Sequence, residues 1–254
     1  MMKKNTYLIK LSGKIIDDQT YIDKFISSIK KLYKRNKIVV VHGGGKQVSL
    51  WMKDLKLEPK FVDGLRFTDE KTLEVVISVL CGLVNKILVQ KFINSGIEKV
   101  VGLSCIDGKL LVTDIDKNLG FVGRNVISIN KDILNLLLKN NYLVLISSVG
   151  LGKDKNLSYY VVTNINADDV TYALADELEV NKVIFLSDVE GVFDKEGKVI
   201  KKLNIKQIDE LIDKKIVSEG MIPKLLAIKK ILTKKNMKIF ISNEIGKKGT
   251  LIYK

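Results

Sequence analysis

Two hydrophobic patterns alternate along this chain. Short runs of apolar residues, such as 6–11 and 38–41, are bounded by polar residues or glycine and are typical of strands buried in a parallel sheet. Between them, the apolar residues of segment 22–33 recur every three or four positions, as on one face of a helix. The chain therefore begins with a strand, a helix and a second strand, which form one β–α–β unit.

The same alternation continues towards the C-terminus. Apolar runs predict further strands at residues 99–103, 143–147, 183–186 and 238–241. Helical periodicity predicts helices at residues 131–140, 205–213 and 223–232, and a further helix that follows the run 163–169 and ends near residue 178. Hairpins are expected at 61–66, within 109–126 and around 153–156. This pattern favours an α/β fold, a three-layer α/β/α sandwich around a mainly parallel open sheet.

Residues 68–95 form the longest predicted helix. Thr68 is expected to be its N-cap, Asp69 and Glu70 lie in its first turn, and Gly96 follows its end. Its apolar residues cover more than one narrow stripe, so we expect part of this helix to face another subunit. No uninterrupted apolar run approaches about 18 residues, so we expect no membrane-spanning segment.

Length and cysteine content restrict the class of protein. A chain of 254 residues is long enough for one large α/β domain or for two lobes that share a sheet, with a change of lobe near residue 180. Two cysteines are too few for a disulfide framework, and an N-terminal apolar run that is broken at Lys10 argues against a signal peptide. We therefore expect a soluble, cytoplasmic protein.

The formal net charge of +14 raises the question of nucleic acid as a partner. Lysines supply 40 of the 43 basic residues, and they are spread along the whole chain with few aromatic residues between them. That distribution argues against a nucleic-acid-binding face. A positive field of this size would still concentrate small anionic substrates or an acidic protein partner.

The most informative local feature is the triplet Gly43-Gly44-Gly45, which follows a predicted strand and precedes a predicted helix. Residues without a Cβ can present successive backbone N–H groups to an anion at the N-terminus of that helix; the structural alternative is a tight turn. His42 is the only histidine, and the chain has no Gly-x-Ser-x-Gly elbow, Walker A loop or Gly-x-Gly-x-x-Gly motif. Cys81 and Cys105 with one histidine do not make a zinc site.

Charged residues at the carboxyl edge of the predicted sheet are the next candidates, because ligands bind there in open α/β sheets. Lys10 ends the first strand, and Asp188 follows a later one. Lys224 lies in the first turn of a helix, where the dipole disfavours a cation unless a bound anion offsets it; the alternative is a solvated surface charge. Arg66 is one of only three arginines and could hold a carboxylate with its bidentate fork.

Two polar residues, Asn164 and Asp168, flank a predicted helix start, so helix capping is the structural alternative for both. Phosphoryl transfer needs cations on both sides of the transferred group, amides around its oxygens and a carboxylate that orients the cations. The chain has candidates for all three parts.

Six segments of the chain stand in an order and spacing that resemble one known family. They are Lys10-Leu11-Ser12-Gly13, Val41-His42-Gly43-Gly44-Gly45, Gly64-Leu65-Arg66-Phe67-Thr68-Asp69, Asn164-Ile165-Asn166-Ala167-Asp168, Leu186-Ser187-Asp188-Val189-Glu190-Gly191 and Gly220-Met221-Ile222-Pro223-Lys224. The family is that of the acetylglutamate kinases, within the amino acid kinase family, and the resemblance covers essentially the whole chain. It departs at Ser12, where the family usually has a glycine of the phosphate loop.

The resemblance implies the amino acid kinase fold and phosphorylation of the γ-carboxylate of N-acetyl-L-glutamate by ATP with Mg²⁺, the second step of arginine biosynthesis. It implies that residues 1–180 bind the amino-acid substrate and dimerise, and that residues 181–254 bind the nucleotide. Family members inhibited by arginine carry an added N-terminal helix, whereas nine residues precede Lys10 here. We therefore expect an arginine-insensitive homodimer.

The resemblance also assigns roles to single residues. Lys10 and Lys224 would stabilise the transition state, and Asp168 would orient them. The substrate would be bound by Gly44, Gly45, Arg66 and Asn164, of which Arg66 would hold the α-carboxylate. The implied nucleotide-binding residues are Gly13, Asp188, Val189, Glu190, Gly191, Val192, Phe193, Ile216, Val217 and Ser218.

Two alternatives stay open at this point. A related kinase for aminoadipate or glutamate linked to an acidic carrier protein is suggested by the segment Cys81-Gly82-Leu83-Val84-Asn85-Lys86, which also resembles that branch, and by the positive charge. Gly64-Leu65-Arg66 favours free acetylglutamate. A more distant alternative is a basic nucleic-acid-binding protein without enzymatic activity.

Overall fold

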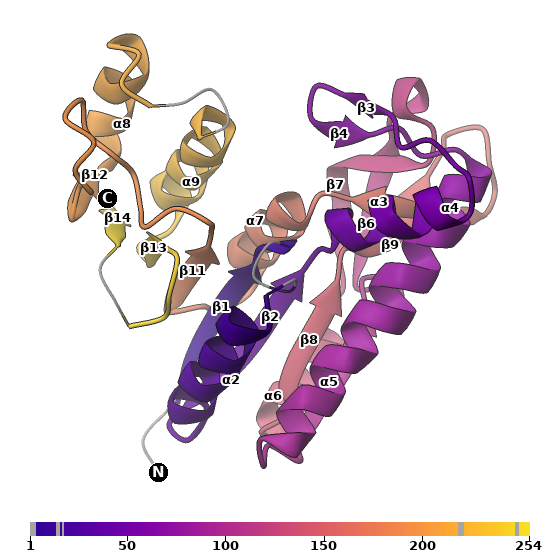
Figure 1. Ribbon diagram of the computed structural model, residues 1–254, viewed down its shortest axis with the longest axis horizontal. Coiled ribbons are helices and arrows are strands. Elements are labelled where there is room, and N and C mark those ends of the chain that lie inside the picture. Colours follow the sequence, from indigo (N-terminus) through magenta and orange to yellow (C-terminus); the bar gives the residue numbers. More distant parts are fainter. Residues whose placement is uncertain (1–3, 14–15, 17, 218–220, 247–248) are drawn as a thin grey trace.

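An open eight-stranded sheet forms the centre of the computed structural model, which describes residues 4–13, 16, 18–217, 221–246 and 249–254 (Figure 1). The strand order is β12-β14-β13-β11-β1-β2-β8-β5, and every neighbouring pair is parallel except β13 and β14. The strands are β1 (Asn5–Leu11), β2 (Asn36–His42), β5 (Val100–Ser104), β8 (Leu143–Ser147), β11 (Lys182–Leu186), β12 (Lys202–Asn204), β13 (Lys238–Ser242) and β14 (Thr250–Tyr253). The predicted mainly parallel sheet is confirmed, although β12 and β14 were not predicted.

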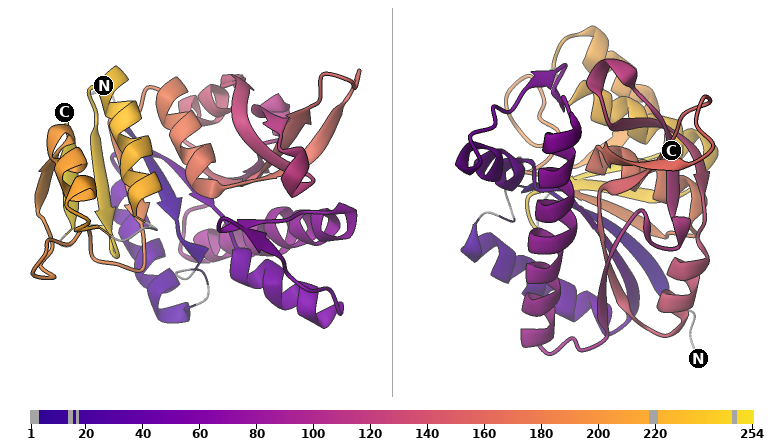
Figure 2. Two further views of the ribbon diagram at one scale, coloured as in Figure 1. Left: turned by 90° about the horizontal axis from the view of Figure 1, so that it is seen from above. Right: turned by 90° about the vertical axis from the view of Figure 1, so that its right-hand side faces the viewer.

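Helices cover both faces of this sheet, as Figure 2 shows. One face carries α2 (Gln19–Tyr33), α3 (Gly45–Asp54), α4 (Glu70–Ile77) and α5 (Asn85–Asn94). The other carries α6 (Asp132–Lys139), α7 (Ala167–Glu177), α8 (Ile205–Asp213) and α9 (Ile222–Lys234). Because side chains alternate along a strand, Leu8 belongs to the core on one face and Ile9 to the core on the other. The three-layer α/β/α sandwich is therefore confirmed.

A small four-stranded barrel stands beside the carboxyl edge of the sheet. Its strands are β6 (Leu111–Ile115), β7 (Val122–Ile129), β9 (Val149–Lys153) and β10 (Tyr160–Ile165), in the order β10-β7-β6-β9. The expected hairpin pieces within 109–126 are β6 and part of β7, with short 3₁₀ turns at η2 (Asp107–Lys109) and η3 (Lys117–Leu119). The expected hairpin around 153–156 joins β9 to β10. Closure of the barrel was not predicted, because it depends on pairing between strands that are distant in sequence.

The predicted hairpin at 61–66 is present as β3 (Phe61–Val62) and β4 (Leu65–Arg66). Its turn residues, Asp63 and Gly64, both have positive φ angles, 49° and 77°. Two positive φ values are those of a type I′ turn, whose twist matches that of the flanking strands.

The long helix differs from the prediction in two respects. Its N-cap is Asp69, whose carboxylate accepts a hydrogen bond from the backbone N–H of Thr72 at 2.8 Å, and not Thr68. The Thr68 hydroxyl is instead directed elsewhere: it donates to the carbonyl oxygen of Arg66 and accepts a hydrogen bond from Asn164 Nδ2. A π-helical segment, η1 (Ser78–Val84), separates α4 from α5.

The long helix also bears on the expectation that no segment spans a membrane. Taken by length and composition alone, the helix Glu70–Asn94 could cross a membrane. In the structure it packs along one face of the sheet, where Val76, Val79 and Phe92 are almost fully buried. Its hydrophobicity is therefore that of a core helix.

Gly120 tests how tightly the barrel is joined to the segment that precedes α4. It has a φ of 78°, and a Cβ at this position would lie 2.3 Å from the carbonyl oxygen of Thr68. We expect Gly120→Ala to lower the free energy of unfolding by roughly 3 kcal/mol or more, because backbone strain is combined with a clash that the backbone cannot relieve.

Gly197→Ala is the matched control. Gly197 has a φ of 75°, but among the described residues no atom beyond its own chain neighbours lies within 4 Å of the place that a Cβ would take. The substitution should cost only the conformational strain, about 1–2 kcal/mol. Urea denaturation of both variants measures the difference, and equal losses would contradict the proposed clash.

Candidate active site

Three neighbouring parallel strands, β2, β1 and β11, end at the carboxyl edge of the central sheet. β1 lies between β2 and β11, so Lys10 stands beside Val41 of one neighbour and Phe185 of the other. The glycine loop that follows β2 and the Ser187–Asp188 turn that follows β11 therefore flank the end of β1. This arrangement confirms that the predicted strand-end residues share one edge.

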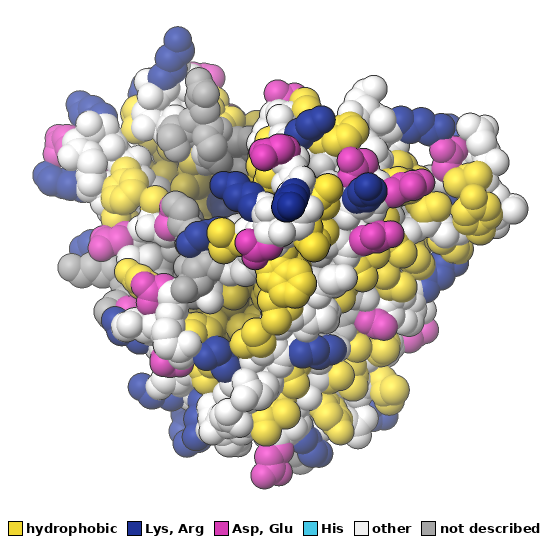
Figure 3. All heavy atoms as spheres, turned by 45° about the vertical axis from the view of Figure 1, so that its right-hand side comes forward, with side chains coloured by type: hydrophobic (Ala, Val, Ile, Leu, Met, Phe, Trp, Pro, Cys, Tyr) yellow, Lys and Arg dark blue, Asp and Glu magenta, His cyan; other side chains and the backbone are white. Residues whose placement is uncertain are grey.

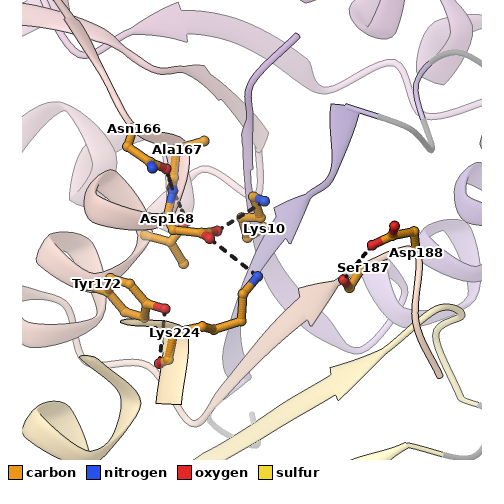
Figure 4. Close-up of polar contacts among 9 residues, drawn as sticks. Lys10, Asn166, Ala167, Asp168, Tyr172, Ser187, Asp188 and Lys224 are labelled. Carbon is orange, nitrogen blue, oxygen red and sulfur yellow. Dashed lines mark hydrogen bonds and ion pairs between the residues drawn. The ribbon is translucent and has the colours of Figure 1, made fainter. Parts of the chain in front are cut away.

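Lys10 and Lys224 converge on Asp168 from two separate elements (Figure 4). Lys10 Nζ lies 3.0 Å from Asp168 Oδ1, and Lys224 Nζ lies 3.3 Å from Oδ2. The side chains of Lys10, Lys224 and Asp168 are 15%, 13% and 22% exposed, respectively, so solvent only partly screens them. Burial alone would raise the pKa of the Asp168 carboxyl, but the two ammonium groups outweigh burial and hold that pKa below its usual value.

The position of Asp168 follows from the start of α7. Asn166 is the N-cap, and its side-chain oxygen accepts a hydrogen bond from the backbone N–H of Asp168 at 2.9 Å. A carboxylate in the first helical turn is also favoured by the helix dipole. Helix capping therefore belongs to Asn166, and both Asn164 and Asp168 are left for other contacts.

Lys224 has further support that the sequence did not reveal. Tyr172, one turn after Asp168 on α7, donates its hydroxyl to the carbonyl oxygen of Lys224 at 3.3 Å (Figure 4). The Lys224 ammonium lies 5.5 Å from the centre of the Phe185 ring, and that ring packs against Tyr172 at 5.2 Å. The i, i+4 spacing of Asp168 and Tyr172 was the only available signal, and it is common on any helix.

The glycine loop brings backbone N–H groups to the same place. Gly44 precedes the first residue of α3 and has a φ of 156°, and a Cβ there would lie 2.8 Å from Leu80. Gly13 packs against it, since a Cβ on Gly13 would lie 3.8 Å from the backbone nitrogen of Gly45. Within the described residues no side chain caps the N-terminus of α3, so its first N–H groups can bind an anion.

Arg66 is a buried cation without an acidic partner in the described part of the chain. Only 7% of the residue is exposed, and burial lowers the pKa of its guanidinium. One guanidinium nitrogen donates to the carbonyl oxygen of Gly45 and to Ser49 Oγ, each at 2.7 Å, while the group lies 4.8 Å from the centre of the Phe61 ring. A buried guanidinium held only by neutral groups is well suited to an anionic ligand.

Several of these groups line one cavity of about 250 Å³, and Asp168 and Lys224 are not among them. Its walls include Lys10, Gly44, Gly45, Arg66 and Asn164. The cavity thus presents two cations, backbone N–H groups and one side-chain amide to a small ligand.

His42 supports the glycine loop from behind. It is fully buried; its Nδ1–H donates to the carbonyl oxygen of Gly43 at 2.9 Å, and its Nε2 accepts a hydrogen bond from Asn85 Nδ2 at 3.0 Å. Burial lowers its pKa to about 4, so the imidazole is neutral at physiological pH. Both ring nitrogens are occupied, which makes His42 a structural residue and not a general base.

Of the residues expected to bind nucleotide, 188–193 come directly after β11, whereas Gly13 follows β1 and residues 216–217 follow α8. Asp188 and Glu190 are exposed, Val189 and Ile216 are half-buried, and Phe193 is 37% exposed. Gly191 packs against Thr250, whose hydroxyl accepts a hydrogen bond from the backbone N–H of Val192. Val192 and Val217 belong to the hydrophobic core. Ser218 lies outside the described residues.

The sequence matches a family of known proteins and several of its members. The model of the amino acid kinase family matches residues 5–243. An acetylglutamate kinase of Endomicrobium trichonymphae is 35% identical over 251 residues, which cover 97% of this chain and 98% of that protein. Another, of Kosmotoga olearia, is 40% identical over 224 residues, which cover 87% of this chain and 77% of that protein.

Solved structures share the fold. The protein smu.665 from Streptococcus mutans UA159 superposes with a TM-score of 0.84 at 29% identity, over 99% of each chain. Carbamate kinase from Giardia lamblia superposes with a TM-score of 0.75 at 18% identity, over the whole of both chains. At 18% identity, the similarity to carbamate kinase shows a shared fold and nothing more.

The buried neutral state of His42 predicts a specific dependence of stability on pH. The unfolded chain binds a proton near pH 6.5, whereas the folded chain resists it down to about pH 4. Between these values the unfolded state binds more protons, so the free energy of unfolding falls as the pH falls, by about 1.4 kcal/mol per pH unit from this group.

His42→Gln should remove this contribution. Between pH 6.5 and pH 4, the free energy of unfolding of the wild type should fall by roughly 3 kcal/mol more than that of the variant, as measured by urea denaturation. Because His42 is the only histidine, no other side chain of its type titrates in this range. Parallel pH curves would contradict the assignment.

Proposed function

The chain belongs to the amino acid kinase family, and we propose that it transfers the γ-phosphate of ATP to the γ-carboxylate of N-acetyl-L-glutamate. The products are ADP and N-acetyl-L-glutamyl 5-phosphate, and the reaction is the second step of arginine biosynthesis. The observation that carries this proposal is the pair of ammonium groups held by Asp168 beside a cavity lined by the buried guanidinium of Arg66, which has no acidic partner among the described residues. The relatives named acetylglutamate kinase extend over most of the chain and support the same reaction.

The proposed chemistry follows from the charges at the site. A γ-carboxylate oxygen forms a bond to the γ-phosphorus, while the bond from that phosphorus to the bridging oxygen of ADP breaks. Negative charge spreads over the transferred group and the leaving oxygen, where Lys10 and Lys224 can stabilise it. Asp168 keeps the two ammonium groups together, so they need not be reorganised during the reaction. No proton has to be removed from an ionised carboxylate, which agrees with a site that has no histidine base.

Binding of the amino-acid substrate needs an anion site at its far end. Arg66 is assigned to the α-carboxylate, because its planar fork can make two parallel hydrogen bonds. Gly44 and Gly45 offer backbone N–H groups to the reacting end, and Asn164 offers an amide. A cavity of about 250 Å³ has the scale of a small substrate.

The nucleotide is assigned to residues 181–254, and the amino-acid substrate to residues 1–180. Gly13, the segment from Asp188 to Phe193 and the segment 216–218 are proposed to bind ATP. The part of the chain that the structure describes contains no cluster of three or more acidic, histidine or cysteine side chains for a metal. Mg²⁺ would therefore be held mainly by nucleotide phosphates and water, as is usual for this ion.

We propose a soluble, cytoplasmic homodimer. Apolar side chains remain exposed on α3 and α5, among them Leu50, Trp51, Ile87 and Ile93, and they support burial against a second subunit. Lys and Arg side chains are scattered among acidic, polar and hydrophobic ones on the face shown in Figure 3, which favours small anions over nucleic acid as ligands.

The carrier-protein kinase alternative is not favoured, since the relatives are named acetylglutamate kinases. A hydroxamate assay tests the proposal directly: hydroxylamine traps the acyl phosphate formed from ATP and N-acetyl-L-glutamate. Turnover of only a carrier-linked substrate, or of none, would refute the proposed function.

Loss of either active-site lysine should slow the chemical step. We expect Lys10→Ala and Lys224→Ala each to lower kcat by about 10²-fold or more, the scale found when one group that stabilises a transition state is removed. The exposed Lys139→Ala on α6 is the matched control and should retain wild-type kcat. Steady-state kinetics measure kcat for each variant, and a decrease in kcat of less than about threefold would argue against the assigned role.

Arg66→Lys should affect binding more than chemistry. The substitution replaces a bidentate fork by a point charge, so the KM for N-acetyl-L-glutamate should rise about tenfold or more with a smaller change in kcat. The KM for ATP serves as the internal control and should stay within about twofold. An unchanged KM for the amino acid would show that Arg66 does not bind it.

A further inference from the structure

Thr68 lies directly behind the two polar side chains that are assigned to the substrate. It is fully buried and does not line the cavity, whereas Arg66 and Asn164 do. Its hydroxyl donates to the carbonyl oxygen of Arg66 at 2.9 Å, and its oxygen accepts a hydrogen bond from Asn164 Nδ2 at 3.2 Å. One hydroxyl therefore joins two ligand-facing residues that are distant in sequence.

The backbone places this hydroxyl accurately. Thr68 donates its N–H to the carbonyl oxygen of Leu119 at 2.9 Å, and Phe121 donates its N–H to the carbonyl oxygen of Thr68 at 2.7 Å. Asn164 in turn donates its N–H to the carbonyl oxygen of Phe121 at 2.9 Å. The same short segment, 119–121, thus holds the main chains of both residues, and their side chains meet as a consequence.

The direction of the two hydrogen bonds fixes the orientation of the Asn164 amide. A hydroxyl has one hydrogen, and here that hydrogen is used on the carbonyl oxygen of Arg66. Towards Asn164 the hydroxyl can only accept, so the NH₂ group of the amide must face Thr68. The amide oxygen, Oδ1, is then the acceptor left for the cavity.

We propose that Thr68 is a positioning residue that holds the Asn164 amide with its oxygen towards the ligand, so that the site selects the N–H of an acylated amine. This inference rests on the proposed function and deepens it, because it assigns the feature by which the acetamido group is recognised. An amide oxygen fixed in this orientation can accept a hydrogen bond from a ligand N–H, whereas it repels a ligand oxygen at the same place. A ligand without the N–H leaves this buried oxygen unpaired, and its binding is weaker for that reason.

Two substrates and two variants test the proposal. The substrates are N-acetyl-L-glutamate and 2-acetoxyglutarate, in which an ester oxygen replaces the amide N–H. Wild type should prefer the amide in kcat/KM by at least tenfold. Thr68→Val, which replaces the hydroxyl by a methyl group, should raise the KM for the amide about tenfold, with kcat within about twofold.

For the ester, Thr68→Val should leave kcat/KM within about twofold or raise it, because the released amide can turn its NH₂ group towards the new acceptor. The preference for the amide should therefore fall about tenfold. Thr68→Ser keeps the hydroxyl and is the matched control, so it should retain the wild-type preference.

Other outcomes overturn the proposal. Equal losses with both substrates would indicate a general structural role for Thr68, and unchanged kinetics would show no role in recognition. Equal use of amide and ester by the wild type would also refute it, and this measurement needs no variant to fold. A wild-type protein that phosphorylates neither N-acetyl-L-glutamate nor its ester would overturn the proposed function, and this inference with it.

Discussion

The arrangement of the site depends on one carboxylate shared by two lysines. Without Asp168, the ammonium groups of Lys10 and Lys224 would repel each other across a partly buried space. With it, a strand end from the first half of the chain and a helix start from the second are held at one point. The pair of cations is preorganised by this ion triad, and a phosphoryl group between two substrates needs such preorganisation.

Several buried polar side chains of the site form hydrogen bonds within the protein and hold neighbouring groups in place. His42 uses both ring nitrogens within the protein, and Arg66 uses neutral oxygens of Gly45 and Ser49. Thr68 uses its only hydroxyl hydrogen on a carbonyl oxygen. These bonds hold the glycine loop, the guanidinium and an amide without neutralising the positive charge of the cavity. The candidate binding groups are therefore fixed in position, and the positive charge of the guanidinium is left without an acidic partner in the described part of the chain.

The sequence by itself determined those parts of the structure that depend on the order of apolar and polar residues within a short segment. Apolar runs located most strands of the central sheet, and the triplet ending at Gly45 predicted the start of α3. Lys10 followed from its place at a strand end, because parallel strands bring their carboxyl ends to one edge. Arg66 could be singled out because arginine is rare in a lysine-rich sequence. Each of these signals lies within a few residues along the chain.

The tertiary structure alone decided which of these residues meet. Closure of the barrel and the pairing of β14 with β12 depend on contacts between segments distant in sequence, for which periodicity gives no signal. Asp69 replaced Thr68 as the helix cap because the Thr68 hydroxyl is used in a contact with Asn164, 96 positions away. Tyr172 meets Lys224 only once α7 and α9 pack together. A sequence specifies local geometry through backbone preferences, whereas such contacts exist only after the chain has folded.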